Sequence, residues 1–219
     1  MGKQPARYGG WSPAVAGGWR KGMDRRRAAY LPLTAEVVAA RLVGDVFMGL
    51  YPLLTDNTCR FLAADFDGST AMLDALAYCK AARASGVPAA LKISQSGRGA
   101  HAFFTDPIRA ATARSVGTVL VHEAMVLRGS MDLRSYDRLF PNQDVLPDGG
   151  LGNLIAAPLQ GRRRKDGLTL FLDLATLEPY EDKWAFLSVL DRLSPGDAER
   201  VARRAKQAVA GVGVAKMSR

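Results

Sequence analysis

The sequence has few of the residues that cross-link or metallate small proteins. Its 219 residues include two cysteines, Cys59 and Cys79, and two histidines. That scarcity excludes a disulfide framework and a cysteine-rich structural zinc site within the chain. We therefore expect no zinc site, and we expect both thiols to be buried as small apolar groups.

Long apolar runs are also missing. No stretch approaches the roughly 18 apolar residues that cross a bilayer, and the N-terminal residues do not follow the charged-then-apolar pattern of a signal peptide. We expect no membrane partner and a cytoplasmic location. The hydrophobic content of 48% is ordinary for a folded enzyme-sized unit, and no internal repeat is visible.

Negative charge is the scarcer sign. The chain has 30 Lys and Arg against 21 Asp and Glu, a net charge of +9. The excess gathers before residue 28, in Arg162–Lys165, and between Arg200 and Lys206. Such clusters suit a polyanion, because each neutralised phosphate releases counterions. At the two ends, solvated surface charge is an equally good interpretation, whereas for the internal block we favour phosphate contact.

Periodicity and turn residues predict the regular elements. Residues 1–29 indicate an irregular basic arm. Thr34 is a candidate N-cap and Gly44 a candidate end for a short helix between them. Further helices are expected at Thr70–Ser85, Pro107–Leu127, Trp184–Leu193 and Asp197–Lys206; strands are expected at Cys59–Ala64, Ala89–Ser94, Ala100–Thr105 and Leu168–Leu174, the middle two forming a hairpin.

The strand that begins at Cys59 leads into two acids one residue apart, Asp65 and Asp67. Side chains alternate along a strand, so both carboxylates project to the same side. Like charges held that close repel one another unless a cation lies between them. Mg²⁺ or Mn²⁺ would supply that cation, since both prefer oxygen ligands. The alternative is a strand end with two solvated acids before a turn.

The tip of the predicted hairpin is a second chemical centre. Ser96, Gly97, Arg98, Gly99 and His101 combine outward-turned backbone N–H groups, a fixed cation and side-chain donors. Together these groups could hold a triphosphate. The alternatives are a common glycine turn and a packed, hydrogen-bonded histidine.

A third centre should complete the metal site, because two carboxylates rarely fill the coordination shells of two ions. Asp137 is the best candidate; Asp132, Asp144 and Asp173 compete with it. The alternative for Asp137 is a turn acid paired with Arg138. We expect an irregular binding loop from Ser135 to Asp144, because regular structure does not account for so many polar residues between apolar ones.

Three motifs in this order resemble those of the archaeo-eukaryotic primase superfamily. They are Asp65-Phe66-Asp67, Ser96-Gly97-Arg98-Gly99-Ala100-His101, and the run from Ser135-Tyr136-Asp137-Arg138 to Asp144. The stretches Phe140–Asp144 and Gly152–Gln160 are most similar to the primase-polymerases of TOTE conflict systems and of CRISPR loci. The similarity extends from about Tyr30 to Leu193, and the three motifs in order make it specific.

The resemblance implies a mixed α/β (α+β) fold, a two-lobed primase catalytic core with an RRM-like sheet beside a central cleft. It places this core at residues 30–193, between the basic arm at 1–29 and a basic helix and tail at 194–219. It implies template-dependent nucleotidyl transfer with two Mg²⁺ or Mn²⁺ ions held by Asp65, Asp67 and Asp137. The implied nucleotide-binding residues are Ser96, Gly97, Arg98, Gly99, His101, Arg138, Asn142, Gln143, Gln160 and Lys165. The nucleic-acid template is expected to contact Arg162, Arg163 and Arg164.

The implied partners are a single-stranded or primed DNA template, a dNTP or NTP, and a helicase or nuclease of the same system. Relatives often carry a cysteine-bearing zinc element before the first motif, which this chain lacks, so primer extension is better supported than primer initiation. Two alternatives stay open: a nuclease or repair-type gap-filling polymerase that uses the same metals, and a catalytically silent replication-initiator module that binds nucleic acid. Sugar preference, template preference and oligomeric state cannot be derived from the sequence.

Overall fold

The computed structural model describes residues 10–11, 33–94, 98–130, 133–146, 148 and 150–204. Most of the predicted basic arm, Ser96, Gly97, Asp132 and the tail from residue 205 lie outside the described residues. The helices are α1 (Ala35–Val43), α2 (Ala71–Ala84), α3 (Ala110–Arg128), α4 (Gly161–Lys165) and α5 (Lys183–Ser188), and residues 195–204 are also helical. The strands are β1 (Gly10–Trp11), β2 (Gly49–Leu50), β3 (Thr58–Phe66), β4 (Ala90–Ile93), β5 (Arg98–Arg109), β6 (Tyr136–Phe140), β7 (Ile155–Ala156) and β8 (Phe171–Leu172).

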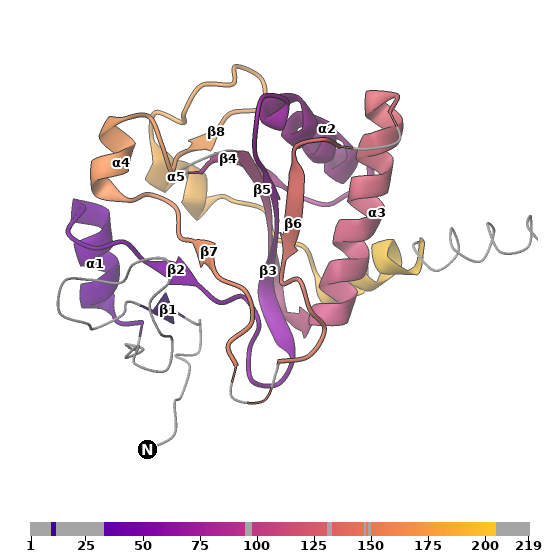
Figure 1. Cartoon of the computed structure of the whole chain (residues 1–219), viewed down its shortest axis with the longest axis horizontal. Helices are drawn as coiled ribbons and strands as arrows, with labels where there is room; N and C mark the ends of the chain where they lie inside the picture. Colours follow the sequence, from indigo (N-terminus) through magenta and orange to yellow (C-terminus); the bar gives the residue numbers. More distant parts are fainter. Residues whose placement is uncertain are drawn as a thin grey trace, which may run out of the picture.

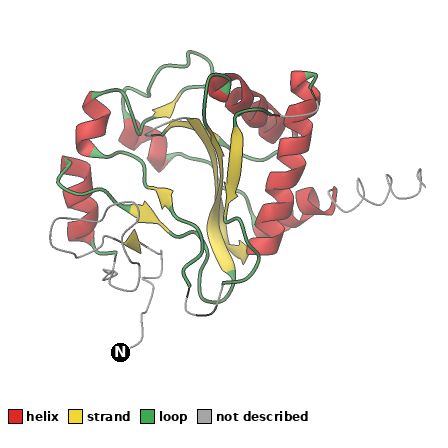
Figure 2. Ribbon diagram, viewed as in Figure 1, coloured by secondary structure: helices red, strands yellow, loops and turns green. Residues whose placement is uncertain are grey.

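A five-stranded antiparallel sheet in the order β6-β3-β5-β4-β8 organises the fold. Helices α2 and α3 lie together against one face of this sheet (Figures 1 and 2). Alternate residues of β3, namely Leu62, Ala64 and Phe66, are buried in the main apolar core on that face. The period-2 pattern of the strand thus commits one face to the core and leaves the other for different contacts.

The opposite face of the large sheet meets the short strands. A three-stranded antiparallel sheet has the order β1-β2-β7, and α1 and α4 lie on the same side of the molecule as this small sheet (Figure 2). Ile155 of β7 packs against Ala63 of β3 and Phe140 of β6 in a second buried cluster. Each face of the large sheet therefore carries its own apolar contacts.

The predicted helix caps and buried thiols are confirmed. Thr34 Oγ1 accepts a hydrogen bond from Val37 N at 3.4 Å at the start of α1, and Gly44 ends the helix with a left-handed φ of 105°. Cys59 and Cys79 are 0% and 2% exposed. Burial raises the pKa of each thiol to about 12, so both remain protonated and inert. In the described part of the chain, no helix is long and apolar enough to cross a membrane.

The helix expected at Pro107–Leu127 is present as α3, but its predicted start at Pro107 was wrong. Strand β5 runs through Pro107 to Arg109, and α3 begins at Ala110. The ladder of β4 with β5 ends at the pair Ala90 and His101, and a single bridge between Phe104 and Leu193 follows on that edge. Beyond this bridge, the described part of β5 pairs with β3 alone. A strand with one unpaired edge tolerates a residue that has no N–H to donate.

Three other expected elements also differ. Tyr136–Phe140 is a strand, not part of an irregular loop, and the polar residues Asp137 and Arg138 point away from the core. The strand expected at Leu168–Leu174 is limited to Phe171–Leu172, and the last predicted amphipathic helix ends at Ser188. Beyond that helix the chain becomes extended, because Leu193 N donates to Phe103 O at 2.8 Å and ties this segment to the edge of β5.

Candidate metal and nucleotide site

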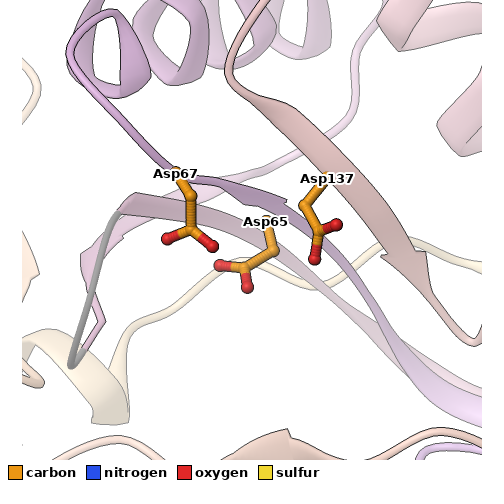
Figure 3. Close-up of side chains that lie close together, drawn as sticks. All are labelled: Asp65, Asp67 and Asp137. Atoms are coloured by element: carbon orange, nitrogen blue, oxygen red, sulfur yellow. The ribbon is translucent and has the colours of Figure 1, made fainter.

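Three carboxylates from two neighbouring strands meet at one end of the large sheet. Asp65 lies in β3, Asp67 directly follows that strand, and Asp137 lies in β6. One oxygen from each lies within 4.8 Å of the others, and Figure 3 shows the three side chains pointing to the same side of the strands. Asp65 is half-buried, whereas Asp67 and Asp137 are exposed. Carboxylate oxygens at this spacing fit the ligand preference of Mg²⁺ or Mn²⁺.

A β-bulge brings Asp137 into this group. Asp65 pairs with Arg138, but the next residue, Phe66, pairs with Tyr136, so Asp137 is one extra residue in β6. Without the bulge Asp137 would lie opposite Phe66 and share its buried face. A bulge re-aims a side chain in this way, and bulges are frequent beside active sites.

The three acids affect one another electrostatically. The pKa of Asp65 is raised, chiefly by burial and then by the negative charges of Asp67 and Asp137, while Lys92 and Arg138 act in the opposite direction. Bringing like charges together raises proton affinity and costs free energy, which a bound cation would offset. The site is therefore electrostatically suited to a divalent ion.

Arg138 neutralises part of this charge. Its Nε donates to Asp137 Oδ2 at 2.6 Å and its Nη2 to Asp137 Oδ1 at 3.2 Å. The hydrogen bond and the charge of Asp137 raise the pKa of Arg138 further. The pairing of Asp137 with Arg138, considered above as the alternative to metal binding, thus coexists with membership of the acidic group.

A cross-strand row extends from the acids over the same face of the sheet, here called the site face. Arg138, Asp65, Gly99 and Lys92 pair in turn across β6, β3, β5 and β4. Paired residues of neighbouring strands project to one face. Gly99 has no side chain, so it leaves space between Asp65 and Lys92; a Cβ there would lie 3.5 Å from His101 Nε2.

His101 fills this space from the next row of the site face. It is 4% exposed, and its ring stacks with Phe61 and Phe103 at centroid distances of 6.4 and 6.2 Å. Its Nε2 atom is buried, and no hydrogen-bond partner for it lies among the described residues. Burial and the charge of Lys92 lower its pKa well below the usual value, so the ring is neutral. A buried donor or acceptor without a partner is costly, which makes His101 Nε2 a candidate contact for a ligand.

Lys92 is a site residue that the sequence did not reveal. It is 2% exposed, and its Nζ donates to Ala156 O of β7 at 3.3 Å. Burial lowers its pKa to about 8, against the opposing effect of Asp65. The only sequence signal was a lysine inside an otherwise apolar strand, two residues before the hairpin turn; its relation to Asp65 depends on the register of β4 and β5.

The other acids considered as metal ligands either have other partners or lie outside the described residues. Asp144 forms an ion pair with Arg114 at 2.6 Å, and Asp173 Oδ1 accepts from Ala175 N at 2.7 Å. Asp132, like Ser96 and Gly97, lies outside the described residues. Arg98 opens β5 opposite Phe66 and Ile93, and only its backbone is described.

The remaining predicted nucleotide-binding residues differ in accessibility. Asn142 N donates to Asn153 Oδ1 at 3.3 Å, and Gln143 Nε2 donates to Val145 O at 3.3 Å in an exposed loop. Gln160, in contrast, is 0% exposed. Its Oε1 accepts from Arg163 N at 2.8 Å as the N-cap of α4, and its Nε2 donates to Gly44 O at 3.1 Å. The structure thus uses the Gln160 side chain to join α1 and α4.

The basic block forms helix α4 and divides into two kinds of residue. Arg162, Arg163 and Lys165 are exposed. Arg164 is half-buried and its Nη2 donates to Leu42 O at 2.7 Å, near the end of α1. Arg163 also lies 5.8 Å from the centroid of the Phe47 ring and 3.7 Å from Asp166. Only part of the block is therefore available to a polyanion.

Comparison with known proteins supports the motif resemblance. No curated protein sequence matches the chain. The family model described as the archaeo-eukaryotic primase domain of the TOTE conflict system matches residues 2–201, which span the acid triad, His101 and α4. The chain therefore belongs to the family of TOTE-system archaeo-eukaryotic primase domains.

Proposed function

We propose that this domain is a DNA primase-polymerase, a nucleotidyltransferase that adds nucleotides to a primer under the direction of a template. The convergence of Asp65, Asp67 and Asp137 at the bulge of β6 carries the proposal. A silent nucleic-acid-binding module would have no use for three mutually repelling acids held together at a cost in free energy. The triad therefore also counts against a purely structural role for the domain.

The three carboxylates would hold two Mg²⁺ or Mn²⁺ ions. Bound there, the metals would supply activation of a primer 3′-hydroxyl and charge neutralisation at the triphosphate and leaving pyrophosphate. The protein's own contribution is to hold Asp65, Asp67 and Asp137 in place before the substrates arrive. Arg138 limits repulsion within the group through its two hydrogen bonds to Asp137.

His101 and Lys92 would bind the triphosphate. His101 offers a neutral Nε2 without a described partner, and Lys92 offers a buried cation beside it on the site face. A cation and a hydrogen-bond donor together recognise phosphate oxygens in a dry site. Within this proposal, Ser96, Gly97, Arg98 and Gly99 complete the phosphate contacts, and Asn142 and Gln143 lie beside the nucleotide. Gln160 contributes indirectly, because its buried side chain joins α1 and α4.

The exposed cations of α4 would contact the template backbone. Arg162 and Arg163 are the accessible arginines of the block, and Lys165 lies at its end. Phosphate contacts of this kind add affinity that does not depend on sequence. Single-stranded or primed DNA is therefore the proposed macromolecular substrate.

The proposal includes a two-lobed core at residues 30–193, with the small sheet, α1 and α4 forming one lobe beside a cleft. Support comes from the division of the described strands into two separate sheets, which meet at the apolar cluster of Ala63, Phe140 and Ile155. Ala198 and Val201 lie beyond the proposed boundary at residue 194 but are buried in the main core. The segment after this boundary therefore packs against the proposed catalytic core.

Incorporation of labelled nucleotides on a single-stranded template, with and without a primer, tests the proposal. The wild-type protein should extend the primer with Mg²⁺ or Mn²⁺, and Asp65→Ala and Asp67→Ala should each abolish incorporation while the circular dichroism spectrum is retained. Incorporation by both variants would disprove the assignment. Degradation of the labelled DNA in place of extension would identify a nuclease. Metal-independent DNA binding without extension or degradation would identify a silent binding module.

A further inference from the structure

Helix α2 carries a fourth acid near the site, one that does not belong to the triad. Asp74 is 2% exposed, although carboxylates are seldom buried without partners. Thr70 Oγ1 and Ser135 Oγ donate to its Oδ2 at 2.9 and 2.7 Å, and Arg128 Nε donates to its Oδ1 at 2.8 Å. Both oxygens of this carboxylate are therefore engaged.

These hydrogen bonds keep the carboxylate ionised. Burial acts to raise the pKa of Asp74, but the donors of Ser135, Thr70 and Arg128 outweigh it and hold the pKa below its ordinary value. An ionised acceptor makes shorter and stronger hydrogen bonds than a neutral one. Asp74 is thus a fixed anionic anchor within the fold.

Ser135 connects this anchor to the metal site. Its hydroxyl donates to Asp74, while its own carbonyl oxygen accepts from Asp67 N at 2.8 Å. Ser135 is 6% exposed and precedes β6 directly, two positions before Asp137. One buried serine therefore fixes the backbone of Asp67 and the entry of the strand that carries Asp137.

The bulge makes this anchoring necessary. A shift of one residue at the start of β6 would remove the extra residue and turn Asp137 toward the buried face. The three acids repel one another, so they do not stabilise their own convergence. Contacts outside the triad must hold Ser135 and β6 in register, and Asp74 supplies two of them, because its Oδ2 accepts from Ser135 Oγ at 2.7 Å and from Ser135 N at 3.4 Å.

We propose that Asp74 is a positioning residue for the metal site and sets its affinity for divalent ions by holding Ser135. Asp74 acts through Ser135 and touches neither metal nor substrate. The inference rests on the proposed function for the identity of the metal site. Groups that orient metal ligands in this way typically change metal affinity by about ten- to a hundredfold when they are removed.

Mn²⁺ binding, measured from the free-ion signal in electron paramagnetic resonance, tests the role without any need for catalysis. We expect Asp74→Asn and Ser135→Ala each to weaken Mn²⁺ binding by about tenfold or more. The double variant should bind no more weakly than the weaker single variant, because both changes break one connection. Ser135→Thr keeps the hydroxyl and should restore binding.

The matched control is Asp144→Asn, which removes one exposed carboxylate near β6 that pairs with Arg114. It should leave Mn²⁺ affinity within twofold of the wild type. Urea unfolding of every variant separates a loss of folded protein from a loss of affinity. If Asp74→Asn does not fold, Ser135→Ala and Ser135→Thr decide the question.

The outcomes separate this inference from the proposed function. Folded Asp74→Asn with wild-type Mn²⁺ affinity, or purely additive losses in the double variant, would overturn the positioning role alone. Mn²⁺ binding that requires Asp65 but is accompanied by no nucleotide incorporation would overturn the proposed function alone. A wild-type protein that binds no Mn²⁺ would overturn both.

Discussion

Asp65 and Asp137 reach the same side of the large sheet because β6 has one residue more than β3 between two successive pairs of the ladder. The pairs are Asp65 with Arg138 and Phe66 with Tyr136. The acid triad is therefore a property of strand register and not of Asp137 alone. Substitutions that change the register of β6 against β3 should therefore alter the metal site even where the substituted residue is remote from it.

Stability without metal should depend on pH through Asp65. The pKa of Asp65 is raised by burial and by the neighbouring acids, so the folded state binds its proton more tightly than the unfolded state. The resulting stability is fully present below the ordinary pKa of about 4 and is lost as the pH rises through the raised value. Urea unfolding from pH 3.5 to pH 7 in a metal chelator measures this loss.

Asp65→Asn should remove this contribution to the pH dependence and raise the free energy of unfolding of the metal-free protein at pH 7 relative to the wild type. Added Mg²⁺ should stabilise the wild type but not this variant. A variant as pH-dependent as the wild type would contradict the role of Asp65.

Asp137→Asn should lower nucleotide incorporation by at least about a thousandfold, because it removes a charged metal ligand from the reacting end of the site. Asp144→Asn should retain the wild-type rate. Steady-state primer extension at saturating Mn²⁺ measures both. A rate for Asp144→Asn as low as that for Asp137→Asn would return Asp144 to the list of candidate ligands, whereas a wild-type rate for Asp137→Asn would exclude Asp137 as a ligand.

Lys92→Met should weaken nucleoside triphosphate binding by about tenfold or more, the usual consequence of losing one charged hydrogen bond. Lys92 has a pKa of about 8 in the folded protein, so wild-type affinity should fall as the pH rises above 8, by at most about tenfold per pH unit. Fluorescent-nucleotide titrations between pH 7 and pH 9.5 measure this dependence. The Lys92→Met variant should show none of it.

The arginines of α4 should separate into two classes. Arg162→Ala and Arg163→Ala should each weaken binding to single-stranded DNA and reduce the slope of log affinity against log salt by about 0.7 for each lost phosphate contact. Arg164→Ala should instead lower the free energy of unfolding by roughly 1.5 kcal/mol, because Arg164 donates to Leu42 O. Fluorescence anisotropy at several salt concentrations and urea unfolding distinguish the classes. An unchanged salt slope in all three variants would exclude α4 as the template contact.

Gln160→Ala should act mainly on stability. Its buried side chain caps α4 and donates to Gly44 O, so the change leaves a buried carbonyl unpaired and should cost about 1–3 kcal/mol. Nucleotide affinity per folded molecule should change by less than threefold. A large loss of affinity at unchanged stability would instead support direct contact between Gln160 and the nucleotide.

The pair Asp65 and Asp67 was predictable because it is a local signal. Asp65 and Asp67 stand one residue apart after an apolar strand, and strand periodicity alone places them on one side. The resemblance of the third motif then indicated Asp137. The caps of α1 at Thr34 and Gly44 followed from equally local preferences.

Lys92 and Asp74 could not be predicted because their roles arise from pairings between distant segments. Lys92 faces the acids only through the register of β4, β5 and β3, across Gly99. Asp74 matters only because α2 lies beside the turn that contains Ser135. The strand Tyr136–Phe140 was missed for a related reason: a bulged edge strand places polar residues in succession, which hides the period-2 pattern.

The pairing of β6 with β3 has a consequence for folding. The two strands are separated in the chain by α2, β4, β5 and α3, so their pairing closes a long loop. Because closing a long loop costs conformational entropy, we expect this pairing to form late in folding. A partly folded chain can contain Asp65 and Asp67 without containing the complete metal site. Recovery of tight Mn²⁺ binding during refolding should therefore lag behind the formation of helical structure, which makes the metal a kinetic probe for the pairing of β3 with β6.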